Sequence, residues 1–387
     1  MAESAQPALT ILTVESIGDI SESTWQAFSG PSNPFLQHRF LQALEHSGCT
    51  SRESGWQPAH LMLYRGQSLV GVAPAYQKTH SMGEYVFDWA WADAYQRYGL
   101  PYYPKLLMAI PFTPSVGKRL LLAETERLTL QPGELKAALD DAAEKIGVHS
   151  WHLLFPDSDD QALLAPAAHL HRLGCQFHWF NRDYHCFDDF LATLTSRKRK
   201  SIRKERRQVT DQGIRFAHFP GETLPEHVLS AFYLFYQATY LKRGQRPYLN
   251  LDFFQALRER QPDQMHVVMA VKDDEMIAGA LFLIGEDTLY GRYWGCLEEY
   301  NHLHFETCYY QGIDLAIARG LRCFDAGAQG EHKLVRGFEP QLTHSFHWVA
   351  HPGFEEAIAR FCEQEAEDVT NYRNAALEAL PYRQGEP

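Results

Sequence analysis

Charged residues and two glycines crowd together in one short stretch of this chain, between residues 325 and 339. The apolar segment Leu321–Phe324 comes directly before it and has the composition of a buried strand. Lysine and arginine can stabilise negative charge on an oxygen, and carboxylates and imidazoles can accept a proton. Glycine lets the backbone approach a ligand, and α/β folds commonly place chemistry where a core strand ends. The candidate groups are Asp325, Gly327, Gly330, Glu331, His332, Lys333 and Arg336. We expect Lys333 to lie in an exposed loop, and the alternative interpretation of the whole stretch is an ordinary solvated loop.

Two further residues are candidate proton acceptors. The segment Thr343–Val349 alternates as a strand does, so His344 and His347 point to opposite faces and only one of them is expected to face a site. We select His344 as the candidate. The alternative is that His344 is structural, as most of the 19 histidines must be. Glu306, just before an expected helix at Thr307–Arg319, is the other candidate.

Metal binding and cysteine chemistry are not predicted. Histidines have ligand-like spacing in His169-Leu-His171, His302-Leu-His304 and His344–His347, but no cysteine or carboxylate completes a known zinc pattern. Cys296, Cys308 and Cys323 stand in apolar contexts, where thiols are usually inert.

A basic segment, Ser196–Val209, holds eight basic residues and one acid. Ser196 is a candidate helix cap and Gly213 a candidate helix end. Ile202 and Val209 would form its only apolar edge, so the segment is predicted to be a surface helix. Arg199, Arg203 and Arg206 are candidates for binding the phosphates of a donor, and the alternative is a solvated connecting helix.

An aromatic segment, Tyr85–Tyr103, is either core or part of an acceptor pocket. Charged residues are interleaved with its rings, and tyrosine presents a polar tip on an apolar body. We expect some of Asp93, Tyr95 and Tyr98 to line a cleft between two domains, and Tyr300 to contribute from the second half of the chain.

Length and composition set the class of protein. With 387 residues, 45% hydrophobic and 22% charged, the chain is globular and long enough for two domains. The net charge of −12 argues against broad nucleic-acid binding. Seven cysteines without a CxxC pair favour a reducing compartment, and we expect a cytoplasmic protein with neither a signal peptide nor a membrane span.

The predicted elements occur twice in the same order. The first copy consists of eight predicted elements in chain order. These are a strand at Thr10–Val14, a helix near Phe40–Glu45, a hairpin at His60–Pro74, a strand at Leu106–Ile110, a helix at Gly133–Ile146, a strand at Ser150–Phe155, a helix at Gln161–Leu173 and a strand at Phe177–Phe187. A hairpin at His266–Ile284 belongs to the second, and Gly71 matches Gly279. Trp89 and Trp294, like Tyr95 and Tyr300, are 205 positions apart, and the motif Gly147–Trp151 recurs at Gly320–Phe324. We interpret this as a tandem duplication.

This order is similar to the GNAT fold, and the doubled form resembles the FemAB family of acyl and aminoacyl transferases, most of all its FemAB-like group. The resemblance covers nearly the whole chain and is carried by Tyr85–Tyr95, Tyr102–Leu106, Ser196–Arg207, Phe324–Lys333 and Arg336–Phe338. It implies an α/β (α+β) fold of two tandem GNAT-like units with mixed central sheets. We expect residues 1–190 to form the acceptor side and residues 191–387 the donor and catalytic side. It also implies that Lys333 has the role of the lysine that Fem transferases need after this strand.

The function that the resemblance implies is N-acyl transfer to a small-molecule or peptide amine, such as a cell-wall precursor. The donor would be acyl-CoA or aminoacyl-tRNA, with the tRNA 3′ end as a partner and no permanently bound cofactor. The phosphate-binding pattern Gln/Arg-x-x-Gly-x-Gly/Ala does not occur intact, and Arg292–Leu297 comes nearest to it. This absence favours an aminoacyl-tRNA or long acyl donor over acetyl-CoA. In addition to the basic helix, the donor-binding candidates are Arg336, Gly327 and Gly330. The alternative function is a non-catalytic scaffold that binds a peptide or peptidoglycan-related ligand.

Overall fold

The computed structural model describes residues 7–328 and 330–383, which form two compact units. Unit 1 holds the described residues up to Pro31, then Phe35–Gly174 and Leu342–Asn371, and unit 2 holds Ser32–Pro34, Cys175–Gln341 and the described residues from Tyr372. The division differs from the expected single boundary after residue 190. The reason is that β9 (Leu170–Phe180), β15 (Glu339–Val349) and α13 (Pro352–Glu378) each begin in one unit and end in the other.

Unit 1 contains two sheets. One has the strand order β1-β3-β4-β7, and in the other the unit 1 part of β15 is followed by β8, β6, β5 and β2. Apolar side chains of β3, β6 and β8 pack against α5 and bury the core of this unit. The strands are β1 (Leu9–Val14), β2 (Trp56–Pro58), β3 (His60–Arg65), β4 (Ser68–Ala73), β5 (Ala75–Lys78), β6 (Lys105–Met108), β7 (Leu121–Leu122) and β8 (Ser150–Leu154). The helices are α1 (Glu22–Ser29), α2 (His38–His46), α3 (Trp89–Arg97), α4 (Glu124–Thr129), α5 (Pro132–Lys145) and α6 (Ser158–Leu164).

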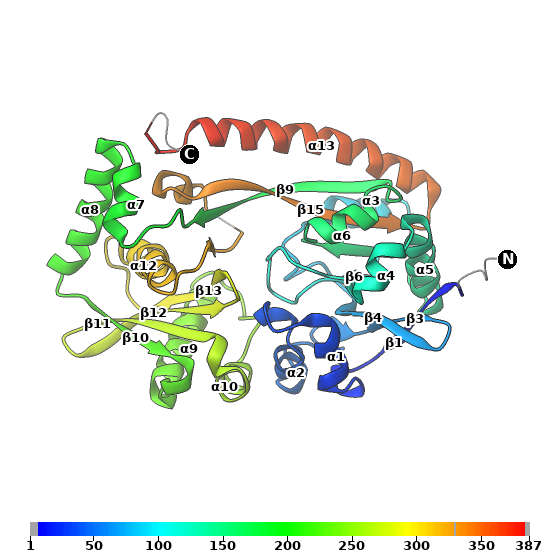
Figure 1. Ribbon diagram of the computed structural model, residues 1–387, viewed down its shortest axis with the longest axis horizontal. Helices are drawn as coiled ribbons and strands as arrows, with labels where there is room; N and C mark the ends of the chain where they lie inside the picture. The colour runs from blue at the N-terminus through cyan, green and yellow to red at the C-terminus, as the bar shows by residue number, and fades with distance from the viewer. Residues whose placement is uncertain (1–6, 329, 384–387) are drawn as a thin grey trace. The chain divides into compact units, whose positions relative to one another are not determined.

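Unit 2 is built on the strand order β10-β11-β12-β13-β14, with the unit 2 part of β9 beside β14. Figure 1 shows α9 on one side of these strands and α12 on the other. Glycines permit both contacts: a Cβ at Gly295 would strike the backbone of Phe235 in α9, and one at Gly312 in α12 would strike the ring of Phe324. The strands are β10 (Arg215–Pro220), β11 (Met265–Lys272), β12 (Glu275–Ile284), β13 (Thr288–Cys296) and β14 (Cys323–Asp325). The helices are α7 (Phe187–Thr193), α8 (Ser196–Asp211), α9 (Glu226–Leu241), α10 (Leu251–Arg260), α11 (Leu303–Phe305), the π-helix η5 (Glu306–Tyr310), α12 (Gln311–Ala318) and the 3-10 helix η6 (Glu331–Arg336).

The two units repeat one order of elements, as predicted. Each has, in this order, a strand, two helices, a hairpin with a two-residue turn and a one-residue bulge, and then a strand, a helix and a second strand that runs parallel to that strand. The parallel pairs are β6 with β8 and β13 with β14, and unit 1 has the additional elements β2, β5, α3, β7 and α4. Gly147 and Gly320 both have φ near +70° (74° and 64°) and follow the helices that lead into the parallel strands β8 and β14. The tandem arrangement of two mixed α/β units is thus confirmed.

The residue match at an interval of 205 is wrong. Trp89 begins helix α3 whereas Trp294 lies in strand β13, and Tyr95 lies in α3 whereas Tyr300 follows β13. Aromatic residues recur in both places because both are partly buried surfaces, not because the elements correspond.

One predicted helix is partly wrong. Residues 161–173 do not form a single helix: α6 ends at Leu164 and β9 begins at Leu170. Pro166 interrupts the helical pattern because proline lacks a backbone N–H. The strand that was expected at Phe177–Phe187 is β9, which ends at Phe180.

The basic segment forms α8 in unit 2, and both Ile202 and Val209 are buried, as predicted. The residue before the helix is Thr195, not Ser196, and its side chain makes no capping hydrogen bond. Gly213, with φ of 76°, follows the helix. No helix among residues 7–328 and 330–383 has the length and apolarity that crossing a bilayer requires.

Candidate functional site

Strands β13 and β14 of unit 2 separate soon after they meet. Their parallel pairing is limited to Thr288–Tyr290 of β13 with Cys323–Asp325 of β14. Strand β13 then continues to Cys296 while β14 ends. On its other edge β13 bulges against β12, because Leu281 pairs with Tyr293 and Phe282 with Gly291, which makes Arg292 the extra residue. A bulge redirects the side chain of the extra residue, and here it directs Arg292 toward the end of β14.

Arg292 holds the buried carboxylate of Asp325. Its guanidinium donates hydrogen bonds of 2.5 Å and 3.2 Å to the two carboxylate oxygens, and the Gly327 backbone N–H donates a third of 2.9 Å. Burial favours the neutral acid, but the attraction of Arg292 and these hydrogen bonds hold the pKa of Asp325 well below its ordinary value. Asp325 is therefore an anion that is already bound, which makes it a weak proton acceptor and a rigid support for the Gly327 turn.

Lys333 is buried, and the expectation of an exposed loop is wrong. The 3-10 helix η6 repeats every three residues, so Lys333 and Arg336 lie on the same face, and both are buried. The Lys333 ammonium donates a 2.6 Å hydrogen bond to the Gly327 carbonyl. Among the described residues no carboxylate comes within 4 Å of it. Burial lowers the pKa of Lys333 to about 8, although Asp325 attracts the charge.

Arg336 is fully engaged within unit 2. It donates to the hydroxyl of Tyr310 (3.0 Å), to the His332 carbonyl (2.8 Å) and to the carboxylate of Glu205 (2.8 Å), and its guanidinium lies 3.5 Å from the ring centre of Phe305. These contacts attach η6 to α8 and η5. Arg336 therefore fixes the segment that carries Lys333.

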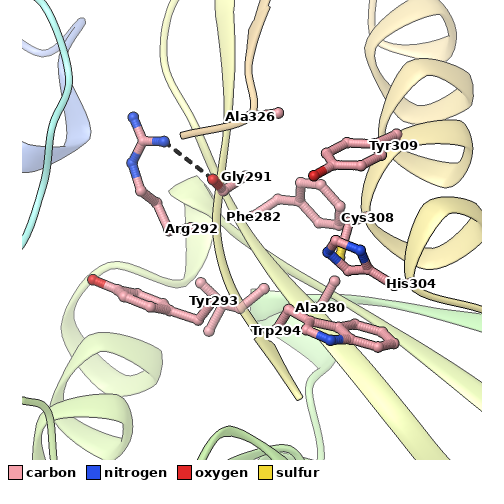
Figure 2. A pocket seen from close by; sticks show the side chains of 11 residues that line it. Ala280, Phe282, Gly291, Arg292, Tyr293, Trp294, His304, Cys308, Tyr309 and Ala326 are labelled. Carbon is pink, nitrogen blue, oxygen red and sulfur yellow. Dashed lines mark hydrogen bonds between the residues drawn. The ribbon is translucent and has the colours of Figure 1, made fainter. Parts of the chain in front are cut away.

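A pocket of about 130 Å³ opens where β13 and β14 diverge. Figure 2 shows His304, Cys308 and Tyr309 on the helical side, opposite Phe282 and Trp294 of the sheet. Ala326, directly before the Gly327 turn, forms part of its wall. The complete lining is Ala280, Leu281, Phe282, Gly291, Arg292, Tyr293, Trp294, His304, Cys308, Tyr309 and Ala326. Lys333 lies beside this pocket, with its ammonium 6.0 Å from the centre of the Tyr309 ring.

Two neutral imidazoles accompany the pocket. Burial lowers the pKa of His304 to about 4 and also lowers the pKa of His332, so both rings are uncharged at pH 7. The Nε2 atom of His332 lies 2.9 Å from the hydroxyl of Tyr309, and a proton can be shared between them. The π-helix η5 carries Cys308 and Tyr309, and such local widening of a helix occurs frequently at functional sites.

Glu306, the buried first residue of the π-helix, pairs with the half-buried Arg206 of α8. Arg206 lies 3.0 Å from Glu306 and 2.7 Å from Asp314, and Gln311 donates a 2.7 Å hydrogen bond to the same oxygen of Glu306. Burial raises the pKa of Glu306 against the attraction of Arg206. Arg206, predicted to bind donor phosphates, is thus bound to two carboxylates, which connect α8 to η5 and α12.

The other cations of α8 are more accessible. Arg203 is exposed and pairs at 2.8 Å with Asp188, which is also exposed, and Arg199 is half-buried beside Ser196. Further exposed cations on this helix are Arg197, Lys200, Lys204 and Arg207. A surface of this kind can bind phosphates, while Arg206 has a structural position.

The predicted acceptor residues are distributed over both units. Asp93 is exposed in α3, pairs with Arg97 and lines an open, mainly apolar pocket on unit 1. Tyr95 is buried in the core and stacks on Phe354, with 3.9 Å between ring centres. Tyr98 is largely exposed. In unit 2, Tyr300 lines a second pocket of about 490 Å³ that includes Lys242 and Arg243.

His344 is in unit 1, where its Nδ1 atom lies 2.9 Å from Nε2 of His171 and the two rings stack. Burial lowers its pKa. The alternation of β15 is as predicted: His347 is buried on the other face, with its Nδ1 atom 2.7 Å from Nδ1 of His152. The structure groups Asp325, Gly327, Gly330, Lys333 and Arg336 in unit 2, whereas His344 has its contacts in unit 1.

Unit 1 contains a buried charge cluster that the sequence analysis missed. Lys105 is completely buried and lies 2.8 Å from Glu84 and 2.5 Å from Asp88, and Tyr102 donates a hydrogen bond to the same Asp88 oxygen. Lys78, also buried, lies 3.8 Å from the ring centre of Trp56. A signal was available: Lys105 directly precedes the apolar run that begins at Leu106, and a charge at the start of a buried strand requires a partner.

The pocket residues His304, Cys308 and Tyr309 were also missed as a group, because the helix was expected to begin at Thr307, which left His304 outside it. All seven cysteines are free, and burial raises the pKa of Cys308 well above its ordinary value, so this thiol is protonated. Within the part of the chain that the structure describes, no three His, Cys, Asp or Glu side chains gather closely enough to hold a metal ion.

Comparison with known proteins agrees with this architecture. The model of the FemAB-like family, described as peptidoglycan biosynthesis/recognition, matches residues 16–384. No curated protein sequence matches the chain. The crystal structure of FemX is similar over 88% of this chain and 98% of that chain, with a TM-score of 0.52 and 12% identity. A tandem GNAT protein from the clavulanic acid biosynthesis pathway is similar over 89% and 99%, with a TM-score of 0.47 and 13% identity. At this identity the likeness to FemX shows the fold, which is that of two tandem GNAT-like units.

Proposed function

Because this chain belongs to the FemAB-like family, we propose that it is an N-acyltransferase, which moves an acyl or aminoacyl group from an activated donor to an amine. The observation that carries the proposal is the pocket between β13 and β14, with the buried ammonium of Lys333 beside it and no carboxylate in contact with that ammonium among the described residues. A positive charge that no neighbouring anion neutralises is suited to stabilising an anion that forms during a reaction.

In the proposed reaction the amine nitrogen attacks the acyl carbonyl carbon, and a C–N bond forms. The carbonyl oxygen becomes an oxyanion, and Lys333 stabilises it by charge and by hydrogen bonding. The C–S or C–O bond to the carrier then breaks, and the carrier leaves as a thiol or hydroxyl after taking up a proton. The amine loses one proton, which the His332–Tyr309 pair accepts, since its imidazole is neutral at pH 7.

The other candidate proton acceptors receive different roles. Asp325 is bound by Arg292 and supports the Gly327 turn. Glu306 anchors Arg206 and therefore α8. His344, predicted as a proton acceptor, lies in unit 1, and we propose that it contacts the acceptor instead.

The donor is acyl-CoA or aminoacyl-tRNA, and no bound cofactor is required. Both donors carry phosphates, for which the exposed cations of α8 offer a binding surface. Both are cytoplasmic molecules, and seven free thiols suit a reducing compartment, so we place the reaction in the cytoplasm. The acceptor is a small-molecule or peptide amine, such as a cell-wall precursor, and the pocket at Asp93 on unit 1 is the proposed surface for it.

The test is the exchange of Lys333 for Met, which preserves bulk and removes the charge. Release of free carrier from acyl-CoA or aminoacyl-tRNA is followed in the presence of amine acceptors. Loss of one oxyanion donor costs roughly a hundredfold in rate, so kcat/KM should fall by about that factor. Lys333→Arg should preserve donor binding better than turnover, because the charge remains but its geometry changes.

Lys145→Met is the matched control, since Lys145 is exposed at the end of α5, pairs with Asp141 and lies outside the pocket lining. Activity in Lys333→Met equal to that of the unmodified protein would exclude this mechanism. Tight binding of a peptide or peptidoglycan fragment without release of carrier from any donor would favour the non-catalytic scaffold.

A further inference from the structure

We infer that the pocket between β13 and β14 limits the transferred acyl group to about six non-hydrogen atoms, and that Cys308 and Ala326 set this limit. The inference rests on the proposed function, because it takes this pocket as the place where the acyl group of the donor binds. It names a class of donor, those with a small acyl group, and excludes long fatty acyl groups.

The volume supports this limit. The pocket measures about 130 Å³. An apolar protein cavity of about 150 Å³ holds one benzene ring, which has six non-hydrogen atoms. Acetyl, propionyl, glycyl, alanyl and seryl groups satisfy the limit, and octanoyl and palmitoyl groups exceed it.

Aromatic rings form much of the pocket wall. The rings of Trp294 and His304 have centres 5.3 Å apart, which is contact distance, and the same two residues line the adjacent pocket of about 490 Å³. A long acyl chain would have to separate these rings to pass from one pocket into the other. The Tyr309 ring packs against Phe305 and Phe338 behind it, and Phe282 packs against Phe324. The aromatic walls are therefore supported by the core of unit 2 and cannot retreat without disturbing that core.

Cys308 and Ala326 are the small residues of the lining at which room can be added or removed. Both are half-buried, whereas Ala280 is packed in the core between β11 and β13. Cys308 stands on the π-helix and Ala326 on the segment that leads from β14 to the Gly327 turn, so they meet the acyl group from two elements. Burial keeps the Cys308 thiol protonated, so it acts as bulk and not as a nucleophile.

The experiment measures binding and is independent of turnover. Dissociation constants are determined by calorimetry for two series of donors: acetyl-, butyryl-, octanoyl- and palmitoyl-CoA, and stable amide analogues of 3′-aminoacyl adenosine with glycyl, alanyl and phenylalanyl groups. In the series that binds, we expect the small members to bind at least about tenfold more tightly than the members above the limit, because one methylene too many in a closed pocket costs 10-fold or more.

Two variants change the limit in opposite directions. Ala326→Leu should remove the advantage of the small acyl groups, so that they bind no better than free CoA or adenosine. Cys308→Ala should improve binding of the first member above the limit by about tenfold. Cys296→Ala, the same exchange in β13 but in the lining of the adjacent pocket, should leave the order of affinities unchanged. Thermal melting of each variant verifies that it is folded.

The outcomes separate the two proposals. If palmitoyl-CoA binds as tightly as acetyl-CoA, or if neither Ala326→Leu nor Cys308→Ala changes the order of affinities, the size limit is wrong while the proposed function stands. If no donor of either series binds to the unmodified protein, the proposed function is wrong and the size limit falls with it.

Discussion

Two of the three buried lysines among the described residues, Lys105 in unit 1 and Lys333 in unit 2, are stabilised in opposite ways. Lys105 in unit 1 contacts two carboxylates, Glu84 and Asp88, and although burial opposes its charge, these anions raise its pKa. Among the described residues, the Lys333 ammonium in unit 2 hydrogen-bonds only to the Gly327 carbonyl, and burial lowers its pKa to about 8. The nearby Asp325 is already bound by Arg292. A buried charge with matched partners supports a fold, whereas a buried charge without them is available to a substrate.

The largest expected effect concerns the matched lysine. Lys105→Met should lower the free energy of unfolding by about 3–5 kcal/mol, because the buried Asp88 loses its cation and Glu84 is left with Lys78 at 3.9 Å. Urea unfolding at pH 7 measures it. Lys136→Met is the control: this half-buried lysine pairs with Asp140 on α5, and such pairs contribute less than about 1 kcal/mol. Similar small effects in both variants would show that the cluster is not a matched set of charges.

The unmatched lysine should respond in the opposite direction. The pKa of Lys333 falls from 10.5 to about 8, so burying its charge costs roughly 3 kcal/mol of stability at about 1.4 kcal/mol per pKa unit. Exchange for methionine removes this cost but also loses the Gly327 hydrogen bond, which contributes about 1 kcal/mol. Lys333→Met should therefore stabilise the protein at pH 7 by about 2 kcal/mol while activity falls. The unfolded state binds more protons between pH 8 and 10.5, so stability of the unmodified protein should rise over that range, and the variant should lack this rise. Destabilisation by Lys333→Met would place Lys333 with Lys105 as a structural residue.

The same lysine predicts how activity depends on pH. The proposed mechanism needs the ammonium form of Lys333, so kcat/KM should decline as pH rises through about 8. Arginine remains charged at these pH values, and Lys333→Arg should lack the decline. A decline that persists in Lys333→Arg would assign it to another group.

The sequence predicted the position of this site better than its environment. Alternation and turn residues indicated the hairpins β3–β4 and β11–β12, and the charged run after β14 indicated Asp325, Lys333 and Arg336. The burial of these side chains follows from the three-residue repeat of η6 against the core of unit 2, which a run of charged letters does not reveal. His304 and Cys308 have the i, i+4 spacing of one helical face, but the helical stretch begins at Leu303, earlier than the start at Thr307 that the sequence indicated. The false match of Trp89 with Trp294 shows that aromatic spacing alone does not identify equivalent strands.

The buried histidines of unit 1 have little effect on stability at pH 7, and their effect appears in acid. Burial lowers the pKa of His152 to about 3 and that of His347 well below its ordinary value, while Lys105 opposes the charge of both and Arg172 does the same. The folded state therefore excludes protons that the unfolded state binds below pH 6.5, so stability should fall as pH falls from 6.5 toward 3, by about 1.4 kcal/mol per pH unit for each histidine. Urea unfolding between pH 4 and 7 measures the slope of the free energy of unfolding against pH. His347→Gln removes one of the two proton-binding groups, so it should reduce this slope by about 1.4 kcal/mol per pH unit. His185→Gln, at an exposed position, should leave it unchanged.

The smallest effect tests the distinction between matched and available charge within one helix. Arg206 of α8 is bound to Glu306 and Asp314, whereas Arg203 is exposed beside Asp188, a pair that water screens. If α8 binds donor phosphates, Arg203→Ala should weaken binding of an aminoacyl-tRNA or CoA donor and reduce the slope of log K against log salt by about 0.7–0.9, the contribution of one phosphate contact. Arg206→Ala should leave that slope unchanged and instead lower the melting temperature, because it leaves the buried Glu306 without its cation. Donor binding at 50 and 200 mM salt, measured for both variants, separates the roles. An unchanged slope in Arg203→Ala would return α8 to the role of a connecting helix.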